Sequence, residues 1–298
     1  LFRALVAVLV FYVAASLGAG LMLPGQLLNA PVPQRTEAQR AQRRAELCPP
    51  GCAWSRHEIR GGGEAALELW WLHRPSPKGV ALILHGFGDD AYGTAGLSQS
   101  LPDWDAVIFT FRGRDRHPEV PSTLGAWERF DVVAAVHFIE GRGVPRSRIL
   151  IAGVSQGAGV ALLALDRLER ERGPLAGALL ESPYLDLEDA ARNHLRGTLG
   201  GFEALARPAE RIALDRAGRL ADFDPAQVSP LRASEGLRTP LAFLTGDADG
   251  ITPLPGVRAI AAGRDLTVVP GAGHCEAGNK VPGGWGAWAR PRLQSWGL

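Results

Sequence analysis

The sequence has no excess of charge of either sign. Its 32 lysines and arginines almost balance its 31 aspartates and glutamates, which leaves a net charge of +1 on 298 residues. This balance provides neither a basic field that would attract nucleic acid nor an acidic tail, and no basic stripe runs along the chain. We therefore expect no nucleic-acid partner. The chain also has no internal repeat, and its length fits one large domain with an appendage.

Lysine is especially scarce. The lysines are Lys78 and Lys280, and the remaining cationic residues are arginines. Together with the abundance of alanine, glycine and leucine, this bias indicates a GC-rich, bacterial genome. That inference concerns codon usage and leaves the function open.

Cysteine is scarce as well, with three in the chain. Cys48 and Cys52 stand in a Pro/Gly turn, and two interpretations stay open: a small disulfide loop, which fits an exported domain, or two unrelated thiols. A zinc site is less favoured because no second Cys/His pair follows at ligand spacing. Cys275 has no partner in this pattern.

One long uncharged run stands near the start of the chain. Residues 4–24 contain no charged side chain, and their polar residues are Tyr12 and Ser16. About 20 such residues suffice to cross a bilayer as a helix. A cleaved signal peptide, which would make the protein exported or periplasmic, is the alternative. We favour a single-pass membrane anchor, whose orientation stays open because arginines stand on both sides of the run.

The remaining chain divides at two composition changes. Residues 25–53 are expected to form a linker, solvated and partly helical, because proline is followed there by Arg, Gln, Glu and Ala. A globular domain is expected over residues 54–298. Within it, residues 185–235 have helical spacing and no strand, which predicts a helical cap or lid over the site.

Short apolar runs alternate with helical patterns in this domain. Helices are expected at residues 94–101, 124–140, 158–165, 257–262 and 286–296. Strands are expected at residues 54–60, 65–74, 80–84, 106–111, 149–154, 175–180, 240–245 and 266–269. This alternation predicts an α/β fold, a mostly parallel sheet with helices on both faces, in which chemistry takes place at the carboxyl ends of the strands.

The turn Gly153-Val154-Ser155-Gln156-Gly157 joins an apolar strand to an apolar helix. Strand, G-x-S-x-G and helix in this order are typical of a nucleophile elbow, where a sharp turn strains the backbone of the serine. The glycines are required because a Cβ at either position would clash across the turn. We therefore expect Ser155 to be a nucleophile, with the N-terminus of the helix beneath it.

A serine nucleophile needs a base and an acid that orients the base. His274 lies on a Gly-rich loop after the last predicted strand and is the expected base. Asp249 is the preferred acid over Asp247, because a sharp turn and a helix start follow it. Asp247 is then a turn residue that supports the loop. Glu181 and Asp186, which follow the preceding strand, are further alternatives for the acid.

The oxyanion hole needs two N–H groups that point to where negative charge develops. One is expected from Gln156, directly after the nucleophile, and the other from Phe87 in the loop His85-Gly86-Phe87-Gly88. Trp285 and Trp288 follow His274 closely, and core packing is their favoured role.

These four motifs resemble the signatures of the α/β-hydrolase superfamily. The similarity covers residues 54–298 and is strongest to the serine-aminopeptidase-like and dienelactone-hydrolase-like branches and to membrane-anchored α/β-hydrolases. The chain departs from them at Ala158, where a second glycine is common. It also departs at Arg112-Gly113-Arg114-Asp115, where an R-G turn usually continues as G-x-S.

The sequence thus predicts a serine hydrolase that cleaves carboxylic esters or related acyl bonds through an acyl-enzyme. Its substrate would be a small-molecule or lipid-like acyl compound, and its mechanism needs neither a metal nor an organic cofactor. An aminopeptidase or a thioesterase on the same triad stays open, because fold does not choose among them. The rival of another class is a non-catalytic scaffold with a hydrolase fold.

Overall fold

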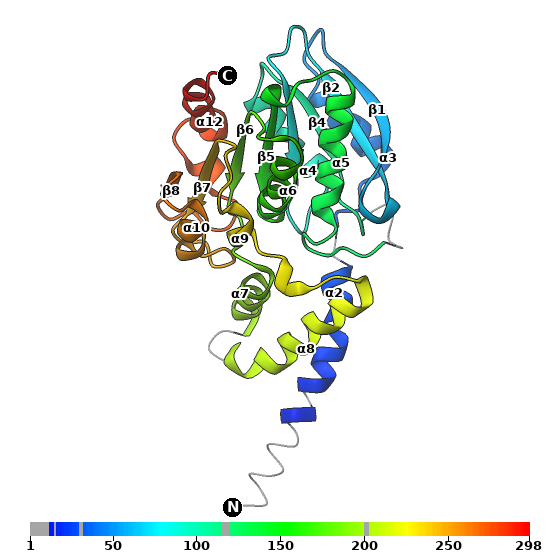
Figure 1. The fold of residues 1–298 in the computed structure, drawn as a ribbon, viewed down its shortest axis with the longest axis vertical. Helices are drawn as coiled ribbons and strands as arrows, with labels where there is room; N and C mark the ends of the chain where they lie inside the picture. Colours follow the sequence, from blue (N-terminus) through cyan, green and yellow to red (C-terminus); the bar gives the residue numbers. More distant parts are fainter. Residues whose placement is uncertain (1–11, 15, 30–31, 115–119, 200–202) are drawn as a thin grey trace, which may run out of the picture.

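The computed structural model describes residues 12–14, 16–29, 32–114, 120–199 and 203–298. Its centre is a sheet of eight strands in the order β1-β2-β4-β3-β5-β6-β7-β8 (Figure 1). β1 and β2 form an antiparallel hairpin, β2 also pairs antiparallel with β4, and all other neighbours are parallel. The strands are β1 (Ala53–Arg60), β2 (Ala66–His73), β3 (Val80–Leu84), β4 (Asp105–Phe109), β5 (Ile149–Val154), β6 (Gly177–Glu181), β7 (Leu241–Gly246) and β8 (Asp265–Val269). The predicted mostly parallel sheet is confirmed.

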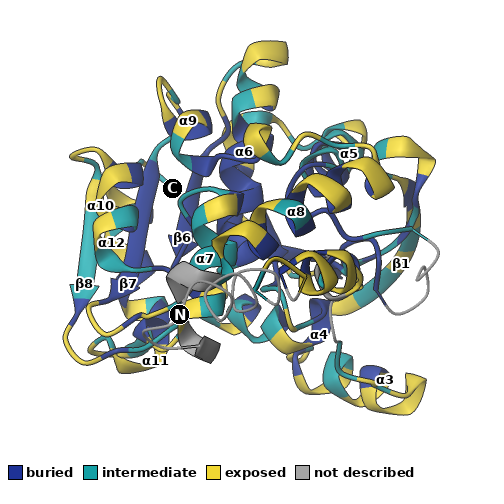
Figure 2. Cartoon of the chain, turned by 90° about the horizontal axis from the view of Figure 1, so that it is seen from below, coloured by how far each residue is buried: buried dark blue, intermediate teal, exposed yellow. Residues whose placement is uncertain are grey.

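Helices cover both faces of this sheet, as predicted. The alternation of β3 divides its side chains between two cores: Val80, Leu82 and Leu84 face one, and Ala81 and Ile83 face the other. Each fully buried Val, Leu or Ile contributes about 1.5–3 kcal/mol, so both layers are needed for stability. The first core includes α5 (Glu128–Gly141), α6 (Gln156–Arg172) and α10 (Leu254–Ala261), and the second includes α4 (Ala91–Thr94), α11 (Ala277–Lys280) and α12 (Gly284–Ser295). Figure 2 shows the buried strands between helices with exposed outer faces.

The chain leaves this layered body between β6 and β7. The predicted helical insertion is observed there as α7 (Leu187–Leu199), α8 (Glu203–Ala221) and α9 (Pro230–Ser234). Figure 1 shows α7 and α8 grouped below the sheet, beside the N-terminal helix that ends in α2 (Pro24–Leu28).

The predicted membrane segment, residues 4–24, lies partly outside the described residues, which exclude 1–11 and 15. Among the residues that are described, none of the helices has the length and apolarity needed to cross a bilayer. Residues 16–22 are helical, and the side of this helix and α2 that carries Ser16, Gly20 and Leu28 is buried. A Cβ on Gly20 would lie 2.7 Å from Ile212 Cγ2, so the helix packs closely against α8.

The predicted linker contains one regular helix, α3 (Glu37–Glu46), which begins with a capping box formed by Thr36 and Gln39. This helix contacts the domain through Arg44, which donates to Tyr92 Oη and whose carbonyl accepts from Trp54. The segment is therefore partly helical, as expected, but its contacts with the domain remove one side of it from solvent.

The disulfide interpretation of the Pro/Gly turn is wrong in this structure. Cys48 and Cys52 are free thiols, and Cys48 Sγ donates to the Cys52 carbonyl oxygen at 3.1 Å. The five-residue turn is closed by this bond and by a backbone bond from Cys52 N to Pro49 O.

Candidate active site

Ser155 occupies the turn between β5 and α6 with a left-handed backbone, at φ 53° and ψ −117°. Its N–H donates to the Glu181 carbonyl at 2.8 Å, which ties the turn to β6. A Cβ on Gly153 would lie 2.7 Å from the Gly157 carbonyl oxygen, and a Cβ on Gly157 would lie 2.4 Å from Leu84 O. The turn is thus strained at the serine and closed to side chains at both glycines.

The structure brings Ser155, His274 and Asp249 together in one chain of hydrogen bonds. Ser155 Oγ lies 2.8 Å from His274 Nε2. On the other side of the ring, His274 Nδ1 lies 2.9 Å from Asp249 Oδ2 and 3.1 Å from Oδ1. These three residues follow β5, β8 and β7, so the carboxyl edge of the parallel sheet assembles them.

The Asp249 carboxylate is buried and held by its own loop. It accepts hydrogen bonds from the Ile251 N–H, the Thr252 N–H and the Thr252 hydroxyl at 2.7–2.9 Å. Burial acts to raise the pKa of Asp249, but the bonds from His274 and Thr252 outweigh it and hold that pKa below its ordinary value. These bonds therefore favour the ionised carboxylate, which faces His274 Nδ1.

The alternative acids form hydrogen bonds with other groups. Asp247 accepts from the Gly271 N–H at 2.7 Å and so joins the two loops that carry Asp249 and His274. Glu181 is buried and accepts from the Gly278 N–H at 2.8 Å, and burial raises its pKa. Asp186 accepts from a backbone N–H in the first turn of α7.

The Phe87 loop lies directly beside Ser155. A Cβ on Gly86 would lie 3.5 Å from Ser155 Cβ, which shows how closely the two backbones approach. Within the described part of the chain, neither the Phe87 N–H nor the Gln156 N–H donates to another group.

Behind the loop, fully buried His85 contacts Gly86 O through Nδ1 at 2.8 Å and accepts from a backbone N–H through Nε2. Burial lowers its pKa, so the imidazole is neutral.

Three residues near the site were not predicted from the sequence. Thr252 stabilises the carboxylate, and its only sequence signal is its place three residues after Asp249. Cys275 directly follows His274, and burial raises the pKa of its thiol. Arg114 contacts both the Phe87 loop and Gln156. Arg114 stands in the Arg112-Gly113-Arg114-Asp115 segment, where the sequence departs from the usual motif. That departure is the feature of the sequence that could have indicated it.

A cavity of about 290 Å³ opens beside Ser155. The layered body around the sheet, the α7–α8 insertion and the N-terminal helix all contribute to its wall. Most of the lining side chains are apolar, and those with polar groups are Ser155, Gln156, Tyr184, His194, Glu210 and Thr252. The lining residues are Leu23, Phe87, Leu124, Ser155, Gln156, Tyr184, Leu187, Ala190, Ala191, His194, Leu195, Glu210, Ala213, Leu214, Ile251 and Thr252.

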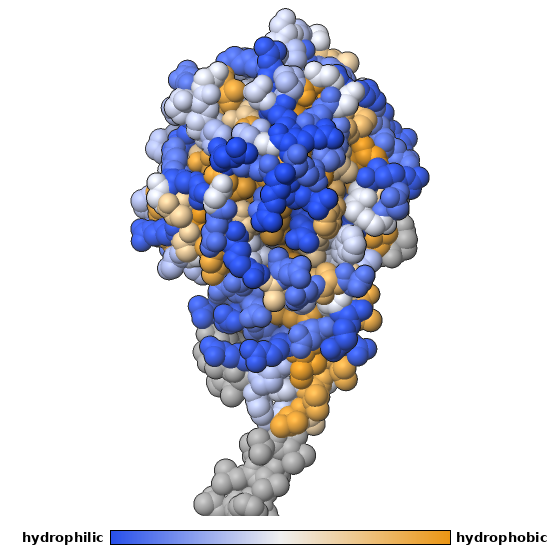
Figure 3. Space-filling model, in the orientation of Figure 1, coloured by the Kyte–Doolittle hydropathy of each residue, from blue (hydrophilic) through white to orange (hydrophobic). Residues whose placement is uncertain are grey.

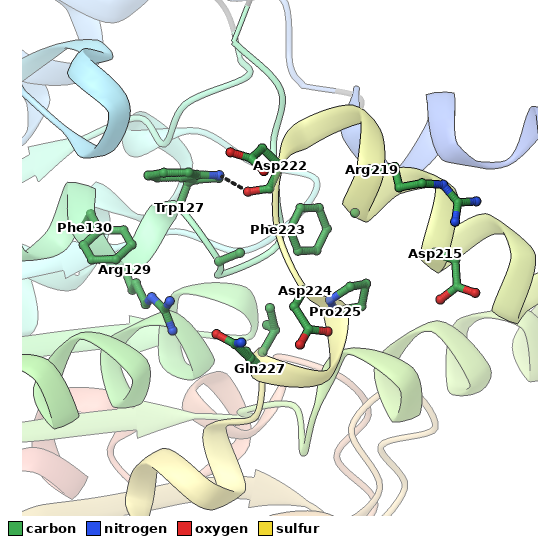
Figure 4. A pocket seen from close by; sticks show the side chains of 13 residues that line it. Trp127, Arg129, Phe130, Asp215, Arg219, Asp222, Phe223, Asp224, Pro225 and Gln227 are labelled. Atoms are coloured by element: carbon green, nitrogen blue, oxygen red, sulfur yellow. Dashed lines mark hydrogen bonds between the residues drawn. The ribbon is translucent and has the colours of Figure 1, made fainter.

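A larger cavity, of about 810 Å³, lies elsewhere, between the start of α5 and the end of α8 (Figure 4). Trp127 lines this cavity, and its indole N–H donates to the carbonyls of Ala221 and Asp222. Its lining mixes aromatic rings with charges of both signs and contains none of the triad residues. We therefore take the hydrogen-bonded group of Ser155, His274 and Asp249, and not the larger cavity, as the candidate site.

The two C-terminal tryptophans are confirmed as core residues. Trp285 and Trp288 are buried in the second core, with ring centroids 5.4 Å apart in an edge-to-face arrangement. They do not line the cavity beside Ser155.

Comparison with known proteins places this geometry in context. No protein-family model matches the chain. An acetyl-hydrolase of Streptomyces hygroscopicus is 32% identical over 193 residues, which are 62% of this chain and 58% of the relative. The match thus spans less than two thirds of that relative's length.

Solved structures of esterases are similar over most of the chain. An esterase of Pyrococcus furiosus aligns with a TM-score of 0.68 and 17% identity, over 91% of this chain and 98% of the esterase. An esterase of the bacterial hormone-sensitive lipase family aligns with a TM-score of 0.60 and 23% identity, over 89% and 92% of the two chains. An esterase from Thermogutta terrifontis aligns with a TM-score of 0.56 and 18% identity, over 81% and 99%. The chain therefore has the α/β-hydrolase fold.

Proposed function

We propose that the protein is a serine esterase that hydrolyses carboxylic esters. The observation that carries the proposal is the continuous bond chain from Ser155 Oγ through His274 to Asp249, which opens onto an apolar cavity. The esterases and the acetyl-hydrolase to which the chain is similar favour ester substrates over peptides.

In this proposal, Ser155 Oγ attacks the ester carbonyl carbon and passes its proton to His274 Nε2. The carbonyl oxygen becomes an oxyanion that accepts from the N–H groups of Phe87 and Gln156. As the tetrahedral intermediate collapses, the C–O bond to the alcohol breaks and His274 returns the proton to the leaving alkoxide. Water then attacks the acyl-enzyme with His274 as the base, which releases the acid and restores the serine hydroxyl.

The cavity favours a substrate with an apolar acyl or alcohol group. Its wall consists largely of leucine and alanine side chains from α7 and α8, so an apolar chain in it would be removed from water. Its volume, about 290 Å³, is at the lower limit of ordinary ligand pockets, which favours small esters over large ones.

Labelling with a fluorophosphonate probe tests the nucleophile. We expect label on Ser155 in the folded protein and none in Ser155→Ala. Turnover of p-nitrophenyl esters from acetate to decanoate should fall by roughly 10⁴-fold or more in the same variant. A folded protein that neither takes the label nor turns over any acyl substrate would favour the scaffold instead.

We also propose that residues 4–24 hold the protein at a membrane. The proposal is supported by the uncharged composition of this run. It is further supported by the outward side of its described part, where Val13, Leu17, Leu21 and Met22 are exposed. Figure 3 shows apolar surface at the lower end of the molecule.

A further inference from the structure

The guanidinium of Arg114 is buried directly behind the predicted oxyanion hole. The residue stands on the segment that follows β4, and its exposed fraction is 2%. Its Nη1 donates to the carbonyl oxygens of Phe87 at 3.0 Å and Asp89 at 2.9 Å, with Gly86 O at 3.4 Å. Its Nη2 donates to Gln156 Oε1 at 2.7 Å. One planar group thus joins the loop after β3 to the first residue of α6.

Those two elements carry the two N–H groups that would receive the oxyanion. Phe87 and Gln156 belong to segments far apart in the sequence, and their relative position decides whether both N–H groups reach one oxygen. The rigid fork of a guanidinium can hold both at once, whereas a lysine ammonium on a flexible stem cannot.

The same contacts strengthen one of the donors. Gly86 C=O and Phe87 N–H belong to one peptide group, and this carbonyl is contacted by both His85 Nδ1 and Arg114 Nη1. Donation to a carbonyl polarises its peptide and makes the attached N–H a better donor. The contacts of His85 and Arg114 with Gly86 O therefore make the Phe87 N–H a stronger donor to a negatively charged oxygen.

The charge of Arg114 also favours negative charge at the predicted oxyanion hole. Within the described residues, every hydrogen bond that Arg114 donates goes to a neutral oxygen. Burial lowers its pKa to about 10, with Glu128, Asp89 and Asp90 acting against this, so the group stays cationic at neutral pH. A cation in this place favours an anion in front of it.

We propose that Arg114 is the positioning residue of the oxyanion hole, fixing the Phe87 loop and Gln156 relative to each other and supplying positive charge behind them. The inference rests on the proposed esterase function. It gives the Arg112-Gly113-Arg114 segment, which departs from related sequences, a role in transition-state stabilisation.

The test compares Arg114→Lys with Arg112→Lys. Arg112 is a matched control because its guanidinium is also buried on this segment but bonds Asp131 and Gly62 O, away from the triad. For p-nitrophenyl acetate we expect Arg114→Lys to lower kcat by roughly 10–100-fold and to change KM by less than about 3-fold. Affinity for phenylboronic acid, whose serine adduct is tetrahedral, should fall in parallel with kcat. Arg112→Lys should leave kcat, KM and boronate affinity within about 2-fold, even where it lowers the melting temperature.

Gln156→Leu provides a second test should Arg114→Lys fail to fold. It removes the side-chain acceptor of Arg114 and keeps the backbone N–H, and we expect kcat to fall by roughly 3–10-fold. Wild-type kcat and boronate affinity in either folded variant would overturn the inference, as would equal losses in Arg114→Lys and Arg112→Lys. Such results leave the proposed function intact, since that fails only where the wild-type protein shows no Ser155 labelling or turnover.

Discussion

At the residue scale, three non-glycine residues with positive φ lie at the carboxyl edge of the sheet, close to the candidate site. Ser155, Ser182 and Cys275 all have positive φ, between 51° and 59°, although none is a glycine. Each such residue costs about 1–3 kcal/mol and persists only where the surroundings hold it. Here the holding groups are the bonds from Ser155 N to Glu181 O and from Ser182 N to Leu244 O. The sheet thus maintains a strained edge where the proposed chemistry takes place.

The assignment of the acid makes a first prediction. Asp249→Asn should lower kcat/KM by roughly 10⁴-fold, because an amide cannot hold the same imidazole tautomer or stabilise the imidazolium. Asp247→Asn is the matched control, since that side chain accepts from the Gly271 N–H in the neighbouring loop and has no other hydrogen bond within the described residues. We expect it to keep kcat/KM within about 5-fold. Steady-state kinetics on both purified variants would contradict the assignment if the two losses were reversed.

The depressed pKa of Asp249 makes a second prediction, on stability. A carboxyl group whose pKa is lower in the folded state binds fewer protons there than in the unfolded chain, so it contributes stability above its unfolded pKa of about 3.9. This contribution is lost as pH falls through the folded value. The difference in free energy of unfolding between wild type and Asp249→Asn should therefore shrink as the pH falls below about 4.

Urea unfolding at pH 7, 5, 4 and 3.5 would measure that difference. Asp247→Asn again serves as the control, and we expect no comparable shrinkage because its carboxylate is exposed. If the difference in free energy of unfolding between wild type and Asp249→Asn stays constant down to pH 3.5, the fold does not stabilise the charged form of Asp249.

Single residues also mark the limit of sequence inference at this site. Ser155 and His274 were predictable because a G-x-S-x-G turn and a Gly-rich loop end define their positions. Asp249 and Asp247 differ by two places in one loop, and only their contacts separate them: Thr252 and His274 for one, Gly271 for the other. The bonds of Arg114 join segments that no local pattern links.

At the element scale, the start of α5 is stabilised by one buried carboxylate. Glu128 accepts four hydrogen bonds, from the Ser122 hydroxyl, the Thr123 N–H and hydroxyl, and the Gly125 N–H, at 2.6–2.9 Å. These bonds close the loop that carries Leu124, whose side chain lines the cavity and whose carbonyl accepts from the Tyr184 hydroxyl. The loop therefore connects the stability of α5 with the shape of the cavity beside Ser155.

Glu128→Gln makes the third prediction. The amide replaces one acceptor oxygen with an NH₂ group that faces donors, so we expect the free energy of unfolding to fall by about 3 kcal/mol. Glu171→Gln on α6 is the control, because Glu171 forms partly exposed pairs with Arg167 and His137 and should cost less than about 1 kcal/mol. Urea titration would contradict the account if both variants lost the same stability.

The same loop explains why one predicted boundary was displaced. Hydrophobic spacing predicts a helix from residue 124, whereas α5 begins at Glu128. Leu124 and Gly125 have φ of 58° and 137°, which a helix does not allow, and the Glu128 carboxylate binds the backbone in this form. Periodicity detects the apolar face of a helix but not a polar side chain that binds the preceding loop.

At the scale of the whole molecule, the cavity joins three segments distant in the chain. Leu23 comes from the N-terminal helix, Leu214 from α8 and Ile251 from the loop after β7. The sheet was predictable because each strand is a short apolar run. The cavity was not, because it depends on how α8 packs against residues 16–28, where Gly20 allows the close approach to Ile212.

The exposed side of that N-terminal helix makes the last prediction. Replacing Leu17, Leu21 and Met22 together with glutamine should weaken binding to phosphatidylglycerol-containing vesicles by roughly 10-fold or more, because a buried leucine or methionine side chain contributes about 1.5–3 kcal/mol. Co-sedimentation of the full chain measures this. None of the three lines the cavity, so turnover of p-nitrophenyl acetate without vesicles should be unchanged. If the triple variant still sediments like wild type, the exposed apolar side does not contribute to membrane binding. Lost turnover without vesicles would instead mean that these residues support the cap, because Leu23 joins them directly to the cavity wall.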